Sequence, residues 1–270
     1  MQLMRRAALD GVQLDELDPA ILIQGVEPGA GRDTIGTASR WDGVGSRVTG
    51  RHRDSLDVTV KFSLDIKKNR MEARSFVLER IAAWASAGGW LTLSSKPNRR
   101  LRVVAGQLPG EGDPLDWTSR FSLTLRAYGV PYWQDDIPTL GAIATASGNT
   151  SLRVPGSMDT PLDVRFTNSG ESAVSALDIT AGDSVFHLTS LGLLAGETLE
   201  IDHPDDGNRS WLRIRICSAA GVYRSALSAR TPASSDDLIL SPGLRTVTVQ
   251  ATGTGTPAGS WGLTVRGRYA

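Results

Sequence analysis

The sequence predicts a mainly β fold with one amphipathic helix, and three patterns along the chain support this. Residues Ser55–Asp65 alternate apolar and polar side chains without a break, which is the period of a half-buried strand. Val77, Ile81 and Trp84 follow at helical spacing and form one apolar stripe. The second half of the chain consists of short alternating segments about ten residues apart, which is typical of a β-sandwich.

The first 54 residues show the weakest pattern. We expect a strand at Ile21–Ile23, followed by a Gly- and Pro-containing loop at Val26–Gly31. Trp41–Gly43 and Gly50–Arg53 have the composition of turns. The segment therefore predicts one short strand between irregular connections.

The helix has recognisable signals at both ends. Asn69 is a suitable N-cap residue, and Glu72 three positions later completes a variant of the capping box. Gly88-Gly89 supplies the left-handed residue that ends many helices, and a strand period restarts at Trp90–Leu93. We expect the helix to lie across a sheet whose further strands are Leu101–Ala105 and Arg120–Tyr128.

A domain boundary is predicted near residues 138–148. Gln134–Pro138 is polar and ends in proline, and Leu140–Thr150 is rich in small residues. The expected domains are therefore 1–138 and 139–270. The strands predicted beyond the boundary are Leu152–Val154, Leu162–Phe166, Leu177–Ile179, Val185–Leu188, Leu199–Ile201, Leu212–Ile216, Leu238–Leu240, Thr246–Gln250 and Trp261–Val265.

Composition narrows the possible partners. Lys plus Arg and Asp plus Glu both number 29, so the formal net charge is zero and tight binding to nucleic-acid phosphates is disfavoured. Cys217 is the single cysteine, which excludes an intrachain disulfide. Neither a Sec-type signal nor an apolar run of about 18 residues is present, so we expect a protein made in a cytoplasm with no membrane partner.

Two basic clusters have two interpretations each. They consist of Arg47, Arg51, His52 and Arg53, and of Arg99, Arg100 and Arg102. One interpretation is contact with DNA or with an acidic neighbouring ring. The other, which we favour because charge runs usually mark exposed loops, is solvated strand ends.

Trp211 and Arg213 are the candidate ligand-binding residues. Alternation predicts that Leu212, Ile214 and Ile216 share one face of a strand, which leaves Trp211, Arg213 and Arg215 on the other. An outward tryptophan beside arginine can stack on a sugar ring, or a loop can cover it. Trp84 and Trp90, near the helix end, are expected in the core or a subunit interface.

No catalytic, cofactor or metal site is predicted. His187 and His203 have no second ligand at metal spacing, and Asp205–Asn208 lacks the alternating ligands of a calcium loop and is expected to be a hairpin turn. Phosphate-loop, nucleophile-elbow and dinucleotide motifs are missing from the sequence. Carboxylates are numerous, but nothing singles out a glycosidase pair, so we expect no enzyme.

The order of these parts resembles the distal tail protein (Dit) family of long-tailed bacteriophages. The resemblance extends over about residues 40–270, and the order of short segments carries it. These segments are the strand at 55–65, the helix ending near "WLTL", "KPNRRLRV", "RFSLTLRAYGVPYW", "GLLAGETLEID", "LILSPGLRTVTVQATG" and "SWGLTVRGRYA".

The resemblance implies a structural role at the phage tail tip. It implies an N-terminal β-sandwich-like domain with one packed helix that forms a hexameric ring, and a C-terminal galectin-like or jelly-roll sandwich outside it. The partners implied are other copies of the chain, the major tail tube protein and the tail-tip hub, with DNA passing through the lumen without specific binding. The virion tail tip, assembled in the host cytoplasm, is the implied location.

Two other functions stay open at this point. One is a glycan-binding module that contacts a saccharide on the host cell surface, supported by the sandwich and Trp211. The other is an enzyme acting on cell-wall sugars, which no motif supports. Microscopy of the purified protein separates the ring from the module, since only the ring has a central hole.

Overall fold

The computed structural model describes residues 6–39, 46–65, 71–110, 120–204 and 212–270, with the backbone alone at 30, 32–39, 46–54 and 71–72. The chain divides into two compact units, Met1–Trp133 and Gln134–Ala270. Strand β8 (Trp133–Asp135) crosses the division. The described residues are mainly strand, which confirms the predicted fold class.

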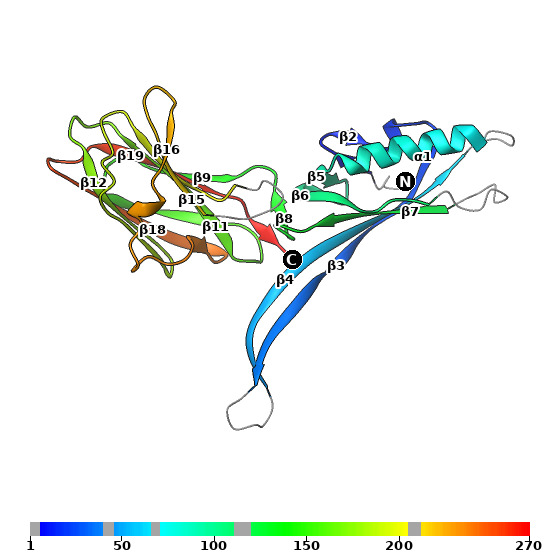
Figure 1. The fold of residues 1–270 in the computed structure, drawn as a ribbon, viewed down its shortest axis with the longest axis horizontal. Coiled ribbons are helices and arrows are strands. Elements are labelled where there is room, and N and C mark those ends of the chain that lie inside the picture. Colours follow the sequence, from blue (N-terminus) through cyan, green and yellow to red (C-terminus); the bar gives the residue numbers. More distant parts are fainter. Residues whose placement is uncertain (1–5, 40–45, 66–70, 111–119, 205–211) are drawn as a thin grey trace. The chain divides into compact units, whose positions relative to one another are not determined.

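The first unit is an antiparallel sheet with one helix on it (Figure 1). Its described strands follow the order β2-β1-β5-β6-β7-β4-β3. Strand β6 pairs with β5 up to Val103 and with β7 from Val104, so it passes from one half of the sheet to the other. This gives the unit its sandwich-like character. The bounds are β1 (Ala7–Leu9), β2 (Val12–Gln13), η1 (Leu14–Glu16), β3 (Ile21–Ser39), β4 (Ser46–Leu64), α1 (Met71–Ser86), β5 (Gly89–Leu93), β6 (Lys96–Gln107) and β7 (Arg120–Ala127).

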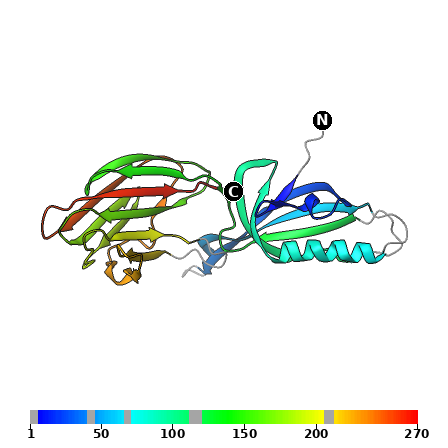
Figure 2. The ribbon, with the colours of Figure 1, turned by 90° about the horizontal axis from the view of Figure 1, so that it is seen from above.

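Helix α1 confirms the expected helix and its C-cap. It runs along one face of the sheet (Figure 2), and Gly88 has a φ of 64° where the helix ends. The expected N-cap, Asn69, lies outside the described residues. The buried apolar stripe of α1 consists of Val77, Leu78, Ile81 and Ala85. Trp84, which we expected in it, is only half-buried, and its Nε1 donates to the Val12 carbonyl at 3.1 Å.

The first 54 residues differ most from expectation. Strand β3 continues from Ile21 to Ser39, so the predicted loop at Val26–Gly31 is strand, and the predicted turn at Gly50–Arg53 lies inside β4. The pairing register of β3 and β4 shifts beside Gly25, Pro28, Gly31 and Gly36. These shifts let the strands continue through residues whose composition suggested loops and turns. Pro28 is tolerated because β3 is an edge strand. The predicted turn at Trp41–Gly43 lies outside the described residues.

Strands β3 and β4 extend beyond the rest of the sheet as a two-stranded ribbon (Figure 1). Strand β7 pairs with β4 only from Ser63 to Leu56, whereas β3 pairs with β4 as far as Ser39↔Ser46. We call residues 32–39 and 46–55 the arm. Within the described part of the chain, the arm has no third strand.

The second unit is a β-sandwich. Its described strands form one sheet in the order β10-β18-β12-β13 and another in the order β16-β15-β14-β11-β19-β9, with β17 paired to β11. The bounds are β9 (Thr139–Ile143), β10 (Gly148–Val154), β11 (Thr160–Asn168), β12 (Val174–Ala181), β13 (Ser184–Leu188), β14 (Thr198–Asp202), β15 (Arg213–Cys217), β16 (Tyr223–Ser225), η2 (Leu227–Ala229), β17 (Ile239–Leu240), β18 (Gly243–Gly253), β19 (Gly259–Val265) and β20 (Arg268–Tyr269).

Alternation predicted most strands of this unit and missed β9, β16 and β20. Every predicted segment lies in a strand, apart from the two end residues Leu212 and Leu238. The small residues that suggested a linker include Gly141, which pairs with Leu263 of β19 and lies against Leu152. The core between the sheets is aromatic at its centre, where the rings of Phe166 and Trp261 lie 4.4 Å apart.

We predict that Ile81→Ala lowers the free energy of unfolding by about 2–5 kcal/mol, because truncating a buried side chain removes contacts and leaves a cavity. Ile81 is a fully buried residue of α1. Phe76→Ala on the same helix is the control, since Phe76 is 59% exposed and should change stability little. Urea unfolding measures both, and equal effects would contradict the assigned helix face.

We predict that Gly259→Ala destabilises the second unit by about 1–3 kcal/mol through overpacking. A Cβ at Gly259 would lie 2.5 Å from the buried ring of Phe166. Gly262→Ala is the matched control on β19, since its Cβ would meet only the Arg165 Cβ at 3.9 Å. Thermal unfolding should separate the two variants, and a stability loss for Gly262→Ala alone would overturn the register of β19.

Candidate functional site

Arg213, one of the two candidate ligand-binding residues, lies on the outer face of the paired strands β14 and β15. Ile201 pairs with Ile214 and Leu199 with Ile216, and all four side chains are buried in the sandwich core. Alternation then places the side chains of Glu200, Asp202, Arg213 and Arg215 on the opposite face. This confirms the alternation predicted for this strand, including Leu212, which packs against the core.

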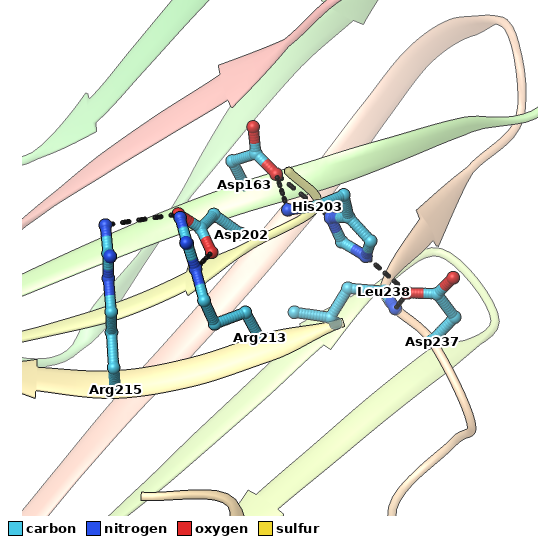
Figure 3. Close-up of polar contacts among 7 residues, drawn as sticks. All are labelled: Asp163, Asp202, His203, Arg213, Arg215, Asp237 and Leu238. Carbon is cyan, nitrogen blue, oxygen red and sulfur yellow. Dashed lines mark hydrogen bonds and ion pairs between the residues drawn. The ribbon is translucent and has the colours of Figure 1, made fainter. Parts of the chain in front are cut away.

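Arg213 is held by a carboxylate (Figure 3). Its Nε donates to Asp202 Oδ1 at 2.7 Å and its Nη2 to Asp202 Oδ2 at 2.5 Å. This bidentate pair raises the pKa of the Arg213 guanidinium, against a smaller opposing effect of burial. Two of its donor groups are therefore already occupied.

Arg215 forms further ion pairs on the same face of β14 and β15. Its Nε donates to Glu200 Oε2 at 2.8 Å, and its Nη2 lies 3.5 Å from Asp202 Oδ2. The guanidinium also lies 4.1 Å from the ring centre of Tyr223 on β16. The face is thus a row of alternating charges that largely neutralise one another.

Trp211 lies outside the described residues, so the structure brings Arg213 together with Asp202 but says nothing of the tryptophan. A saccharide site at Trp211 and Arg213 stays a prediction. Any sugar would have to compete with Asp202 for the donors of Arg213, or use the atoms that this pair leaves over.

His203, directly after β14, lies between two carboxylates (Figure 3). Its Nδ1 is 2.9 Å from Asp163 Oδ1 on β11, its Nε2 contacts Asp237 Oδ1 just before β17, and its side chain is 3% exposed. Both ring nitrogens must carry a proton to donate to both carboxylates. Burial lowers the pKa of His203, but the two carboxylates outweigh burial and raise it to about 9.

Sequence reasoning missed this cluster. Asp163 and Asp237 are 40 and 34 residues away from His203 in the chain, and no motif connects them. His187, the other histidine considered, lies 2.7 Å from Asp178 on the neighbouring strand, half-exposed. Among the described residues, no group of three or more His, Cys, Asp or Glu side chains is arranged to hold a metal ion.

The basic clusters of the first unit are only partly described. Arg100 lies 3.9 Å and Arg102 5.6 Å from the ring centre of Trp90, so these arginines stack on an aromatic ring at the sheet. The other cluster, at 47 and 51–53, belongs to β4, but its side chains lie outside what the structure describes. In the described part of the chain, no helix has the length and apolarity needed to span a membrane.

Comparison with known proteins gives a likeness at the level of structure. No protein-family model matches the sequence. No curated protein matches it either. The crystal structure of the Dit protein of phage SPP1 matches with a TM-score of 0.69 and 15% identity, over 98% of this chain and 99% of that chain.

The chain has the Dit fold. The SPP1 protein is described as a paradigm of the hub adsorption apparatus in phages that infect Gram-positive bacteria. A chain of the phage P2 baseplate, in its activated conformation with Ca, matches with a TM-score of 0.50 and 7% identity, over 98% of both chains. The resemblance to Dit proteins, predicted from the order of segments, is therefore confirmed for the fold.

We predict that Arg213→Ala lowers the free energy of unfolding by no more than about 1 kcal/mol, because solvent screens exposed ion pairs. The side chains of Arg213 and Asp202 are 42% and 25% exposed. Urea unfolding of the variant beside Arg165→Ala, a more exposed arginine, measures the effect. A loss of several kcal/mol would contradict the assignment of this pair to the solvated face.

Proposed function

We propose that this protein is a structural component of a phage tail tip. In this proposal its first unit closes with five other copies into a hexameric ring that joins the tail tube to the tail-tip hub. DNA passes through the lumen, and the second unit lies outside the ring. Support comes from the Dit fold, which extends over 98% of the chain, and from the arm.

The arm is the structural feature that most directly supports the proposed ring. Past Leu56 the ribbon of β3 and β4 has lost β7, and the backbone groups along its outer edges have no strand partner in the described chain. A two-stranded hairpin alone is marginally stable in water, and open strand edges are templates for pairing with another chain. A second copy of the same chain would supply the missing contacts.

The sheet order suits a head-to-tail contact. Strands β3 and β4 lie at one end of the order and β2 at the other. A ring of identical copies needs such a heterologous interface, in which different surfaces meet and the rotation closes. A stable interface buries on the order of 1,000 Å² or more, which an arm can reach by lying along its neighbour.

Charges on the sheet are compatible with DNA passage. Lys61 Nζ lies 2.7 Å from Glu27 Oε1, and Arg126 forms a bidentate pair with Asp57. Cations already paired to carboxylates bind phosphates less tightly, and DNA must slide rather than be retained. The proposal assigns no catalytic step to the protein, and places it at the virion tail tip after assembly in the host cytoplasm.

We predict that the purified full chain forms rings with a central hole, seen by negative-stain microscopy and as one oligomer in sedimentation. In the test variant, residues 32–55 are replaced by an Asn-Gly turn between Gly31 and Leu56, which removes the arm and retains the apolar half of β4. This variant should sediment as a folded monomer. Leu244→Ser is the control, because Leu244 is 72% exposed on β18 of the second unit.

Two fragments test the division of roles. Residues 1–138 should still form a closed oligomer, while 139–270 should be a folded monomer. Rings that persist without the arm, or a second fragment that oligomerises while the first stays monomeric, would overturn the proposal. Saturable micromolar binding of host cell-wall saccharide by a monomer, lost in Trp211→Ala, would support the glycan-binding alternative instead.

A further inference from the structure

A segment of the second unit covers the edge of strand β13. We call residues 229–238, from the last residue of η2 to the residue before β17, the strap. Strand β13 pairs with β12 on one side, and its other side faces the strap. Two backbone hydrogen bonds join the strap to β13, from Thr231 N to His187 O at 3.0 Å and from Ser235 N to Val185 O at 2.7 Å. A third runs from Thr189 N, directly after β13, to Ala229 O at 2.8 Å.

Two serine hydroxyls complete this cover. Val185 N donates to Ser235 Oγ and His187 N donates to Ser234 Oγ, both at 2.9 Å, and Ser234 Oγ also lies 3.1 Å from His187 O. The strap therefore pairs with the backbone groups at the edge of β13 partly through side chains, and the two segments do not form a continuous ladder of backbone hydrogen bonds. Such an attachment has fewer cooperative contacts than a strand and opens more easily than the core.

The strap is fastened at its C-terminal end by His203. Asp237 contacts Nε2 of His203, while Nδ1 of the same ring bonds Asp163 on β11. The next residue, Leu238, is fully buried, and its carbonyl accepts from Leu162 N at 2.9 Å. One imidazole thus ties the strap to the sheet through a bond that requires a proton on each ring nitrogen.

We infer that His203 is a proton-dependent latch that holds the strap over β13, and that loss of its second proton releases the strap and uncovers the edge of that strand. A neutral ring keeps one N–H, so one nitrogen then directs a lone pair at a carboxylate. The bond to Asp163 or the bond to Asp237 must break. Because Asp163 belongs to a strand paired on both sides, the strap is the element that moves.

The charged groups in contact with His203 both favour its protonated form. Asp163 faces the ring from β11 and Asp237 from the strap, while Asp202 of β14 is already paired with Arg213 of β15. Arg230 and Asp236 pair within the strap, and His187 of β13 pairs with Asp178 of β12. The charged groups that contact His203 are therefore both acidic and stabilise the protonated ring.

The sign of the pH effect follows from the pKa of His203, which rises from 6.5 to about 9 on folding. The latch contributes its full stability below the unfolded pKa of 6.5. It loses that contribution as the pH rises through about 9. The strap is consequently fastened at acidic and neutral pH and opens at alkaline pH.

The test follows the His203 imidazole and the strap separately in the full-length protein. Nuclear magnetic resonance of the His203 ring should show titration near pH 9. Hydrogen exchange, corrected for the intrinsic pH dependence of amide exchange, should show protection of the Thr231 and Ser235 amides falling about tenfold or more between about pH 7 and about pH 10. The core amides of β11 should not change.

Two variants and a control make the test specific. In Asp237→Asn the pKa of His203 should fall, and the strap should open at lower pH. In His203→Gln, strap protection should be low at every pH, because the glutamine amide carries its N–H donors on one nitrogen, whereas the imidazole donates to the two carboxylates from two separate nitrogens. His187→Gln, a half-exposed histidine on β13 paired with Asp178, should leave the strap unchanged.

Three results would overturn the latch. They are titration of His203 near its ordinary value of 6.5, equal strap protection at about pH 7 and about pH 10 after correction, or an Asp237→Asn variant whose strap behaves as in the original protein. Because Asp237→Asn preserves shape, it stays informative if His203→Gln does not fold. None of these results depends on ring formation, so the latch and the proposed function fail or succeed separately.

Discussion

The first unit depends on one strand that is paired on both sides. Over Leu56–Ser63, β4 has β3 on one side and β7 on the other. The apolar side chains of this half of β4 are all buried, namely Leu56, Val58, Val60, Phe62 and Leu64. A shift of one residue would turn this whole apolar set to the wrong face, so the register is strongly specified. The same strand then leaves the sheet as one half of the arm. A fixed register in the core thereby sets the direction in which the arm departs.

The predictability of the elements follows from where their side chains go. The apolar half of β4 and the buried face of α1 could be predicted because each element has one face buried and one face in solvent. The sandwich strands show the same alternation. Strand β3 could not, because an edge strand has fewer constraints and its glycines and Pro28 fit register shifts that leave no periodic signal. Strand β9 was missed because small residues beside β19 resemble a linker in composition.

The polar contacts were the least predictable part. Alternation correctly set the inner and outer faces of β15, but it could not show that Arg213 is committed to Asp202. The grouping of His203, Asp163 and Asp237 depends on loops that bring distant residues together. Formal net charge conceals such local pairing. The zero total does not show which cations and carboxylates meet on one sheet face, as Lys61 and Glu27 do on the first unit.

The arm also affects how such a chain can change over evolution. No third strand pairs with its backbone in the described residues, so added or removed residues disturb only the ribbon itself. Two residues inserted in each strand would lengthen it by about 7 Å and keep every other side chain on its original face. Its reach is therefore adjustable in regular steps while the buried half of β4 stays untouched. In the proposed ring, a change in the length of the hairpin alone would change how far the arm extends along a neighbouring copy.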